Sequence, residues 1–267
     1  MTLARLCQAD VEERLNTSRF GRRLEMFWSC DSTNDELAAR AAQGAAEGTL
    51  VVAEEQTAGR GRRGRSWHSP AGENLYFSLL LRPDARAGGM APLSLLAGAA
   101  LARSLADLGF SPRLKWPNDV LLDSQAGCRK VAGILAEMAS AKEQVRHIVL
   151  GIGINVNSRC FPAEIESRAT SLALVRDRAV DRSSVLAAFL NEFEPMYDEL
   201  LAHGPIPGLA VWRRFALLGQ PCFVDRAAGR IEGIAASVDD SGALLVETPN
   251  GDVVSVHAGE VNWPKAM

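Results

Sequence analysis

The pattern of apolar and polar residues predicts mixed helices and strands up to about residue 218. Thr33 and Glu36 fit a capping box with apolar residues at helical spacing after it, so a helix is expected to begin there. Helices are expected over residues 1–20, from that capping box to about 43, and over 93–108, 185–203 and 209–218. Strands are expected over residues 22–28, 49–53, 74–82, 113–116, 120–123, 130–138 and 147–156.

From Gly219 onward the pattern changes to short strands separated by turn residues. Strands are expected over residues 221–224, 230–235, 243–247 and 253–256, and Asn250-Gly251 is a strong hairpin signal. The change predicts two domains, a larger domain over residues 1–216 and a small β-barrel over 217–267.

The longest apolar stretch, residues 90–108, is interrupted by Arg103 and Asp107. It falls short of the roughly 18 apolar residues of a membrane span and is predicted to be an amphipathic helix. The N-terminus lacks the apolar core of a signal peptide. The five cysteines are widely spaced and form no C-x-x-C pair, which indicates neither a disulfide scaffold nor a zinc site. A cytoplasmic protein is expected.

Composition narrows the classes further. Of the 267 residues, 47% are hydrophobic and 23% charged, which excludes a disordered chain. The net charge of −3 gives no general affinity for nucleic acids or membranes, so any anion must be bound locally. Only four of the 29 basic residues are lysines, so a lysine inside a motif is more informative than an arginine.

Residues 59–67 concentrate positive charge, with four arginines between Arg60 and Arg65 interleaved with glycines. Glycines allow backbone N–H groups to approach one anion, arginines bind phosphate and carboxylate, and Trp67 offers a face for an aromatic ring. Repulsion between these charges is expected to keep the loop mobile until an anion binds. A nucleic-acid-binding arm and a solvated loop without a ligand remain alternatives.

Three further segments, 115–119, 129–137 and 151–157, are candidates for the same site. In the first, a rare lysine precedes a Pro-Asn-Asp turn, which can also be an ordinary turn. In the second, Gly133 interrupts an apolar strand next to Lys130, which suggests close approach of a ligand or of another backbone. In the third, Gly151 and Gly153 leave one face of a strand bare and predict a slot for a flat ligand, although glycines also serve backbone packing.

Other chemistries find little support in the sequence. The four histidines show no metal-ligand spacing, so no metal-binding residue is predicted, and there is no G-x-S-x-G motif. The neighbours Arg129 and Lys130 would favour a thiolate at Cys128, but the sequence provides no histidine partner for a catalytic cysteine.

Taken together and in order, these segments resemble the biotin–protein ligase family. The matching pieces are Asp31-Ser32-Thr33-Asn34, residues 55–67, Asn74-Leu75-Tyr76-Phe77-Ser78, residues 115–119, residues 130–135 and residues 151–157. The resemblance implies an α+β fold, with a mixed sheet and flanking helices plus a small C-terminal SH3-like barrel. It also implies two steps, formation of biotinyl-5′-AMP from biotin and ATP and transfer of biotin to a lysine.

The resemblance implies ATP, biotin and Mg²⁺ as substrates and cofactors. The partner would be the biotin carboxyl carrier protein of acetyl-CoA carboxylase, and a homodimer formed through a sheet edge is common in the family. A lipoate–protein ligase and a non-catalytic nucleic-acid-binding module are the alternatives. About 30 residues precede Asp31, too few for the DNA-binding domain of many bacterial members, so a ligase without repressor function and without DNA as a partner is expected.

The resemblance also assigns roles to individual residues. The expected catalytic residues are Lys130, Arg60, Lys115 and Asp119. The expected biotin-binding residues are Ser32, Thr33, Asn34, Gln56, Gly59, Arg60, Gly61, Arg62, Lys130 and Gly133. The expected ATP-binding residues are Arg62, Arg63, Arg65, Trp67, Lys115, Asn118, Lys130 and Asn155. Lys130 resembles the lysine on the biotin carboxylate and α-phosphate, Trp67 and Asn155 resemble adenine contacts, and Asp119 resembles an acid that assists transfer.

Overall fold

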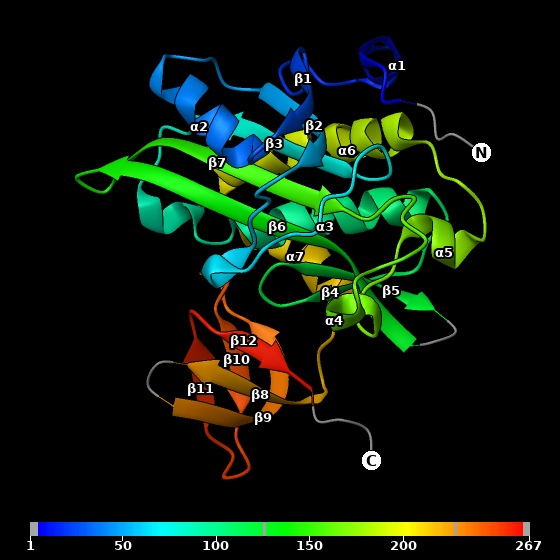
Figure 1. The fold of residues 1–267 in the computed structure, drawn as a ribbon. Coiled ribbons are helices and arrows are strands. Elements are labelled where there is room, and N and C mark those ends of the chain that lie inside the picture. The colour runs from blue at the N-terminus through cyan, green and yellow to red at the C-terminus, as the bar shows by residue number, and fades with distance from the viewer. Residues whose placement is uncertain (1–4, 125–126, 227–228, 264–267) are drawn as a thin grey trace.

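The computed structural model describes residues 5–124, 127–226 and 229–263, which form two β-sheets with helices packed on the larger one (Figure 1). The larger sheet contains β1 (Arg23–Cys30), β2 (Thr49–Gln56), β3 (Leu75–Leu81), β4 (Pro112–Lys115), β5 (Asp119–Ser124), β6 (Gly127–Ala141) and β7 (Gln144–Ile154). The helices are α1 (Gln8–Arg14), α2 (Thr33–Ala42), α3 (Leu93–Asp107), α4 (Ala163–Glu166), α5 (Leu172–Arg176), α6 (Arg182–His203) and α7 (Ile206–Phe215).

The larger sheet is mixed, as the sequence predicted. Its strand order is β1-β2-β3-β7-β6-β5-β4; β1 and β2 are parallel and joined by α2, and every other pair is antiparallel. The long strands β6 and β7 lie at the centre of the sheet, and along much of their length more buried and more exposed residues alternate. The predicted mixed sheet with flanking helices is therefore confirmed.

The two faces of this sheet are covered differently. One face is covered by α3, α6 and α7, which also pack against one another, and it carries the main hydrophobic core. On the other face α2 covers only part of the sheet, where Leu37 packs with Val51, Leu80 and Val149. The arginine-rich segment of residues 59–67, called the basic loop below, covers the ends of β6 and β7 beyond α2. The candidate site lies there.

Helix α3 is apolar almost all round rather than amphipathic as predicted. Eleven of its 15 residues are buried, because it packs on the sheet and on α6 and α7. One helical stretch in the described residues, Gly88–Asp107, is long and apolar enough to cross a membrane, and 72% of its most apolar window is buried in the molecule. Arg103 and Asp107, which interrupt the apolar run in the sequence, lie within this stretch, and its burial is that of a core helix.

The N-terminal segment is less helical than predicted. Residues 1–4 lie outside the described residues, and the helix covers only Gln8–Arg14. The carboxylate of Glu194 on α6 accepts hydrogen bonds from the backbone N–H groups of Ser18, Arg19 and Phe20. These bonds fix a turn where the sequence alone predicted a continuing helix.

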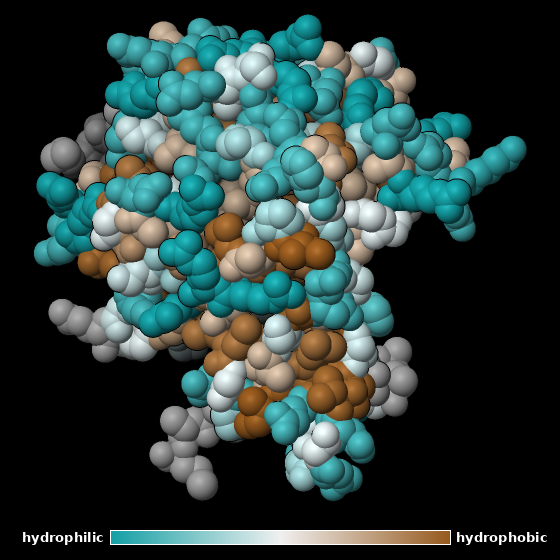
Figure 2. Space-filling view, turned by 180° about the vertical axis from the view of Figure 1, so that it is seen from behind, coloured by the Kyte–Doolittle hydropathy of each residue, from teal (hydrophilic) through white to brown (hydrophobic). Residues whose placement is uncertain are grey.

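The C-terminal sheet contains β8 (Pro221–Arg226), β9 (Gly229–Val238), β10 (Leu244–Glu247), β11 (Val253–Val256) and β12 (Glu260–Asn262). Its order is β11-β10-β9-β8-β12, with every pair antiparallel. The first four strands were predicted, β12 was missed, and the SH3-like barrel stays a prediction. On the face in Figure 2, hydrophobic residues gather over this smaller part of the molecule.

The C-terminal sheet is seated on the larger domain at a defined contact. The indole Nε1–H of Trp116, in the turn after β4, donates to the Gly242 carbonyl at 3.0 Å. A Cβ built on Gly242 would lie 3.1 Å from Leu95 of α3. This contact brings β12 to the rim of the site formed by the larger sheet.

Candidate active site

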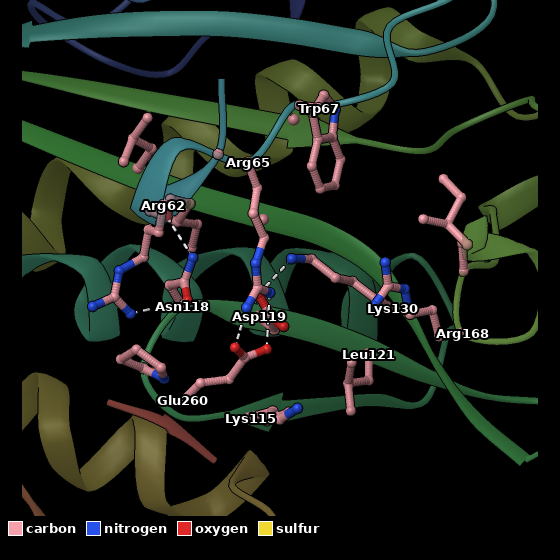
Figure 3. A pocket seen from close by; sticks show the side chains of 18 of the residues that line it. Arg62, Arg65, Trp67, Lys115, Asn118, Asp119, Leu121, Lys130, Arg168 and Glu260 are labelled. Atoms are coloured by element: carbon pink, nitrogen blue, oxygen red, sulfur yellow. Dashed lines mark hydrogen bonds and ion pairs between the residues drawn. The ribbon is translucent and has the colours of Figure 1, made fainter. Parts of the chain in front are cut away.

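A cavity of about 790 Å³ lies on the face of the sheet that α2 leaves uncovered (Figure 3). Its walls come from the N-terminus of α2, the basic loop, the turn before β5, the segment around α4, and β12. Every predicted site residue lines this cavity except Gly59. A Cβ on Gly59 would lie 2.8 Å from Ser69 Oγ, so this glycine permits close packing beneath the loop.

The floor of the cavity is formed by glycines on β6 and β7. Gly133 pairs with Gly153 across the two strands, and Gly151 follows on the same face. A Cβ on Gly153 would lie 2.4 Å from the Trp67 indole nitrogen, and one on Gly151 would lie 2.1 Å from Asn34 Oδ1. The predicted bare face exists, but a ring and an amide of the protein itself lie on it.

The indole N–H of Trp67 is buried and has no hydrogen-bond partner among the described residues. The Lys130 ammonium lies 5.2 Å from the centre of the same indole ring, a cation–π distance. The ring and the Lys130 ammonium lie side by side over the glycine floor, because a Cβ on Gly133 would lie 3.0 Å from the ring and 3.2 Å from Lys130 Nζ.

Polar side chains at the N-terminus of α2 form one end of the cavity. The predicted capping box is wrong: Ser32 is the N-cap without a side-chain cap bond, and Thr33 is already helical. The Thr33 hydroxyl instead donates to Gln56 Oε1 at 3.2 Å and lies 2.8 Å from Ser78 Oγ. Tertiary partners on β2 and β3 replace the local cap, which turns these groups toward the site.

The basic loop is folded back on itself. Gly61 N–H donates to the Arg65 carbonyl at 2.7 Å, and Trp67 N–H donates to the Gly59 carbonyl at 2.8 Å. At the tip, Arg63 and Gly64 have φ values of 58° and 72°, a left-handed conformation that glycine adopts easily. The four arginines consequently spread in different directions rather than stacking on one face.

Carboxylates from distant segments offset the repulsion expected within the loop. Arg60 forms ion pairs with Asp35 of α2 and Glu137 of β6, at 2.7 and 2.8 Å. Arg65 forms a two-bond pair with Glu260 of β12, which Figure 3 shows pointing up into the site. No local pattern indicated these partners, because they lie 25 to 195 positions away from the arginines.

Arg62 and Lys115 are two of the cavity's cations that form no ion pair with a carboxylate among the described residues. Arg62 is half-buried, and its described bond is to the amide oxygen of Asn118 at 3.3 Å. Burial lowers the pKa of Arg62, as does the neighbouring charge of Arg63. Burial also lowers the pKa of Lys115, against the opposing effect of Asp119. Both side chains therefore carry a positive charge that nearby carboxylates offset only in part. A bound phosphate would supply the missing negative charge.

Lys130 stands at the centre of the site. Its ammonium lies 2.6 Å from Asp119 Oδ1 (Figure 3). Its backbone N–H donates to the Arg168 carbonyl and its carbonyl accepts from Thr170 N–H, both at 2.8 Å. The segment after α4 therefore fixes the Lys130 backbone, and Asp119 of β5 holds its ammonium.

The segment around α4 forms a wall that sequence reasoning missed. Phe161, Ile165 and Arg168 line the cavity here, and Leu121 faces them from β5. Asn155 is buried and donates to the Thr170 carbonyl at 3.0 Å, which ties this wall to the end of β7. Two apolar residues in a polar stretch just after the 151–157 motif were the available signal.

Cys128 also lines the cavity but is not activated. Although the residue is exposed at the surface, partial burial of the sulfur and a hydrogen bond to Asp123 raise the pKa of its thiol to about 12. The prediction that Arg129 and Lys130 favour a thiolate was wrong, since burial of the sulfur and the nearby Asp123 carboxylate both raise the pKa of the thiol.

A bare sheet face covered by a cation-rich loop defines a protein that brings anionic ligands together. Comparisons with known proteins agree with this. Residues 27–155 match the biotin/lipoate A/B protein ligase family, and residues 217–262 match the biotin protein ligase C-terminal domain.

Individual relatives are similar over most of the chain. The biotin–[acetyl-CoA-carboxylase] ligase of Paracoccus denitrificans is 39% identical, over 88% of this chain and 98% of that protein. The bifunctional ligase/repressor BirA of Bacillus spizizenii is 38% identical, over 92% and 76% respectively. The solved biotin protein ligase of Aquifex aeolicus in complex with biotin and ATP is 31% identical, covers 90% of this chain and 98% of that one, and has a TM-score of 0.76. The chain belongs to the biotin protein ligase family.

Proposed function

We propose that the chain is an ATP-dependent ligase that attaches biotin to a lysine of the biotin carboxyl carrier protein of acetyl-CoA carboxylase. The names of its relatives and their complexes support this activity. The C-terminal match is to a biotin protein ligase domain, and the comparisons give no support to the lipoate or nucleic-acid alternatives. DNA is not among the partners that we propose.

The reaction has two steps in which the atoms balance. A biotin carboxylate oxygen attacks the α-phosphorus of ATP, an O–P bond forms, and the bond to the pyrophosphate oxygen breaks. The lysine amine then attacks the biotinyl carbonyl carbon, and AMP leaves with the bonding pair while the amine loses a proton. Neither step needs a covalent nucleophile on the enzyme.

One observation carries the proposal: Arg62, Lys115 and Lys130 converge on a single cavity above a glycine floor. An anion attacks a polyanion in the first step, so positive charge must offset both the repulsion and the charge that develops on the phosphoryl oxygens. We assign Lys130 to the biotin carboxylate and α-phosphate, and Arg62 and Lys115 to the remaining phosphates. Asp119, beside Lys130, would accept the proton in the transfer step.

Biotin and ATP would occupy opposite ends of the cavity. Ser32, Thr33, Asn34 and Gln56 supply polar groups for the biotin ring system at one end. Trp67 and Asn155, with the wall around α4, would hold the adenosine part at the other. The cavity of about 790 Å³ has the size range of pockets for such ligands.

Mg²⁺ would enter with the phosphates of ATP. The residues that the structure describes contain no cluster of three or more His, Cys, Asp or Glu side chains suited to a metal ion. Asp119 and Glu260, the carboxylates on the cavity wall, would complete the coordination of a phosphate-bound ion. The ion would supply further positive charge at the phosphates.

We further propose that the protein is a cytoplasmic homodimer. We also propose that its larger domain ends at residue 216 and its C-terminal domain begins at residue 217. In the described residues β5 accompanies β6 only as far as Gly133, so residues 135–141 of β6 have an open edge. Met138 on this edge is 44% exposed. Sedimentation velocity with biotin and ATP should show a species of twice the chain mass; a single-chain mass at every concentration would contradict the dimer.

The decisive experiment combines the protein with ATP, Mg²⁺, biotin and a biotin carboxyl carrier domain. Intact mass and a streptavidin blot should show one biotinyl group on the carrier, dependent on ATP. Modification with lipoate instead of biotin would make the chain a lipoate ligase. Absence of both transfer and pyrophosphate release would overturn the ligase assignment.

A further inference from the structure

A line of hydrogen bonds crosses the open face of the larger sheet, from β3 to the basic loop. Ser78 Oγ donates to Asn34 Oδ1 at 2.6 Å, and Asn34 Nδ2 donates to Glu137 Oε2 at 2.6 Å. The Arg60 guanidinium donates to the same Glu137 oxygen at 2.8 Å. A single carboxylate oxygen on β6 therefore joins the α2 end of the cavity to the loop that covers it.

Glu137 is close to the cavity without lining it. It follows Gly133 and Leu135 on the same face of β6, and both of those residues line the cavity. Its two hydrogen-bond donors, Asn34 and Arg60, also line the cavity. A ligand would touch the two donors rather than the carboxylate that orients them.

The bonds of Asn34 fix the orientation of its amide. The oxygen is directed at Ser78, the nitrogen is directed at Glu137, and the amide lies directly on Gly151. Rotation of the amide by half a turn would place its nitrogen against the Ser78 hydroxyl and its oxygen against a carboxylate. The repulsion between the two oxygens disfavours that arrangement.

Arg60 is held by a second carboxylate as well. The same guanidinium nitrogen donates to Asp35 Oδ1 at 2.7 Å, and the side chain of Asp35 does not line the cavity. Exposed ion pairs are individually weak, and Arg60, Asp35 and Glu137 are 40–57% exposed. Two carboxylates on one guanidinium hold the loop more firmly than either would alone.

We propose that Glu137 is a positioning residue for the biotin end of the site. It orients the Asn34 amide toward the ligand and, together with Asp35, anchors the basic loop over the glycine floor through Arg60. The identity of the ligand rests on the proposed function, whereas the anchoring of the loop does not. Asp35 shares only the second task, so it provides the matched control.

Three variants separate the two tasks. Glu137→Ala removes the partner of both Asn34 and Arg60. Glu137→Gln keeps an oxygen for the Asn34 amide but loses the charge opposite Arg60. Asp35→Asn weakens the anchor on Arg60 and leaves Asn34 untouched.

The first measurement is the KM for each substrate, by pyrophosphate release. Loss of a hydrogen bond to a charged group predicts a rise of about tenfold in the biotin KM of Glu137→Ala and about threefold or less in the other two variants. The ATP KM should change less than about twofold in all three, because the anchor lies at the biotin end. Equal biotin KM values in Glu137→Ala and Asp35→Asn would overturn the positioning of Asn34.

The second measurement is limited trypsin digestion without ligands, because the loop offers several arginines to the protease. If the carboxylates anchor the loop, cleavage between residues 60 and 66 should be about fivefold faster in Glu137→Ala and at least about twofold faster in Asp35→Asn. Wild-type rates in every variant would overturn the anchor. If wild-type protein released no pyrophosphate with biotin, the proposed function would be wrong, and the digestion would still decide the anchor.

Discussion

At the scale of single residues, the site works by the balance between cations and the carboxylates that hold them. Lys130 and Asp119 are in contact, while Arg62 and Lys115 have an incomplete set of counter-charges. An incoming phosphate would therefore meet positive charge that is already partly desolvated and needs little rearrangement. Preorganised charge of this kind is the largest single contribution to many enzymatic rates.

Lys130→Ala should leave the fold intact and remove most adenylation. Loss of one charge that stabilises the transition state predicts a fall of about 10²–10³-fold in kcat, measured by pyrophosphate release. Lys142→Ala is the control, since Lys142 is exposed at the turn between β6 and β7. Near-normal turnover in Lys130→Ala would remove this lysine from the mechanism.

Glu54→Ala should destabilise the protein without touching the site. Glu54 and Arg182 are 3% and 4% exposed and form a buried ion pair at 2.5 Å, and Glu54 also accepts from Leu6 N–H. Removing one partner of a buried pair costs about 3–5 kcal/mol in the free energy of unfolding. Urea unfolding measures this cost.

The control for this comparison is Asp225→Ala. Asp225 pairs with Arg230 at the surface, with both side chains about half exposed, so this change should cost less than about 1 kcal/mol. If Glu54→Ala and Asp225→Ala lowered the free energy of unfolding equally, burial would not explain the strength of the Glu54–Arg182 pair.

At the scale of elements, the glycine positions of β6 and β7 determine what can lie on the sheet. Gly153→Ala would place a methyl group 2.4 Å from the Trp67 indole nitrogen, so the ring must move. Because Trp67 is a proposed adenosine contact, we expect the ATP KM to rise about tenfold, while the biotin KM changes less. Pyrophosphate release against both substrates measures the two values.

Gly88→Ala is the matched control for the glycine floor. A Cβ on Gly88 has nothing within 4 Å, and its φ lies outside the left-handed region. Its KM values should equal those of the wild type. A normal ATP KM in Gly153→Ala would mean that the indole ring does not need its position on β7.

The central elements of the fold were predictable because their patterns are strong. β3, β6, β7 and α3 carry long apolar or alternating segments, and the motif glycines were located from sequence. The predictions failed where distant partners decide the structure. Asn191 of α6 bonds Arg14 and Asn16 where the N-terminal helix ends, and Glu194 bonds residues 18–20 beyond it. Strand β12 is only three residues long and depends on pairing with β8.

The same reason explains which site residues the sequence missed. Lys130 and the arginines stand in compact motifs, so their types and spacing were informative. Glu137 and Glu260 act only through side chains that the fold brings to them, and neither has a local pattern that indicates an ion pair. Local sequence motifs therefore predict the residues that contact a ligand better than they predict the residues that position those contacts.

At the scale of the whole molecule, acid should weaken the attachment of the N-terminal segment to α6. Burial alone would raise the pKa of Glu194, but the hydrogen bonds from Phe20, Ser18 and Arg19 outweigh it and lower the pKa. A lowered folded pKa means stability that is present above about 4.3, the ordinary glutamate value, and lost as the pH falls through the folded value.

Glu194→Gln should therefore be less stable than the wild type at pH 7, and the difference should shrink as the pH falls below about 4. Urea unfolding across this pH range measures both curves. A difference that stays constant down to the acid limit would show that the charge of Glu194 does not stabilise the fold.

The ion pair between Arg65 and Glu260 has a consequence for how the enzyme comes into being. A polypeptide is made from its N-terminus onward, and domains fold in that order. The proposed biotin end of the site uses residues up to Gly133, whereas Glu260 lies on β12, the last strand of the described chain. Before β12 has left the ribosome, the growing chain already contains the residues of the proposed biotin end. At that stage Arg65 of the basic loop lacks the Glu260 carboxylate. The proposed nucleotide end is completed last, so the newly synthesised protein forms its biotin site before its ATP site.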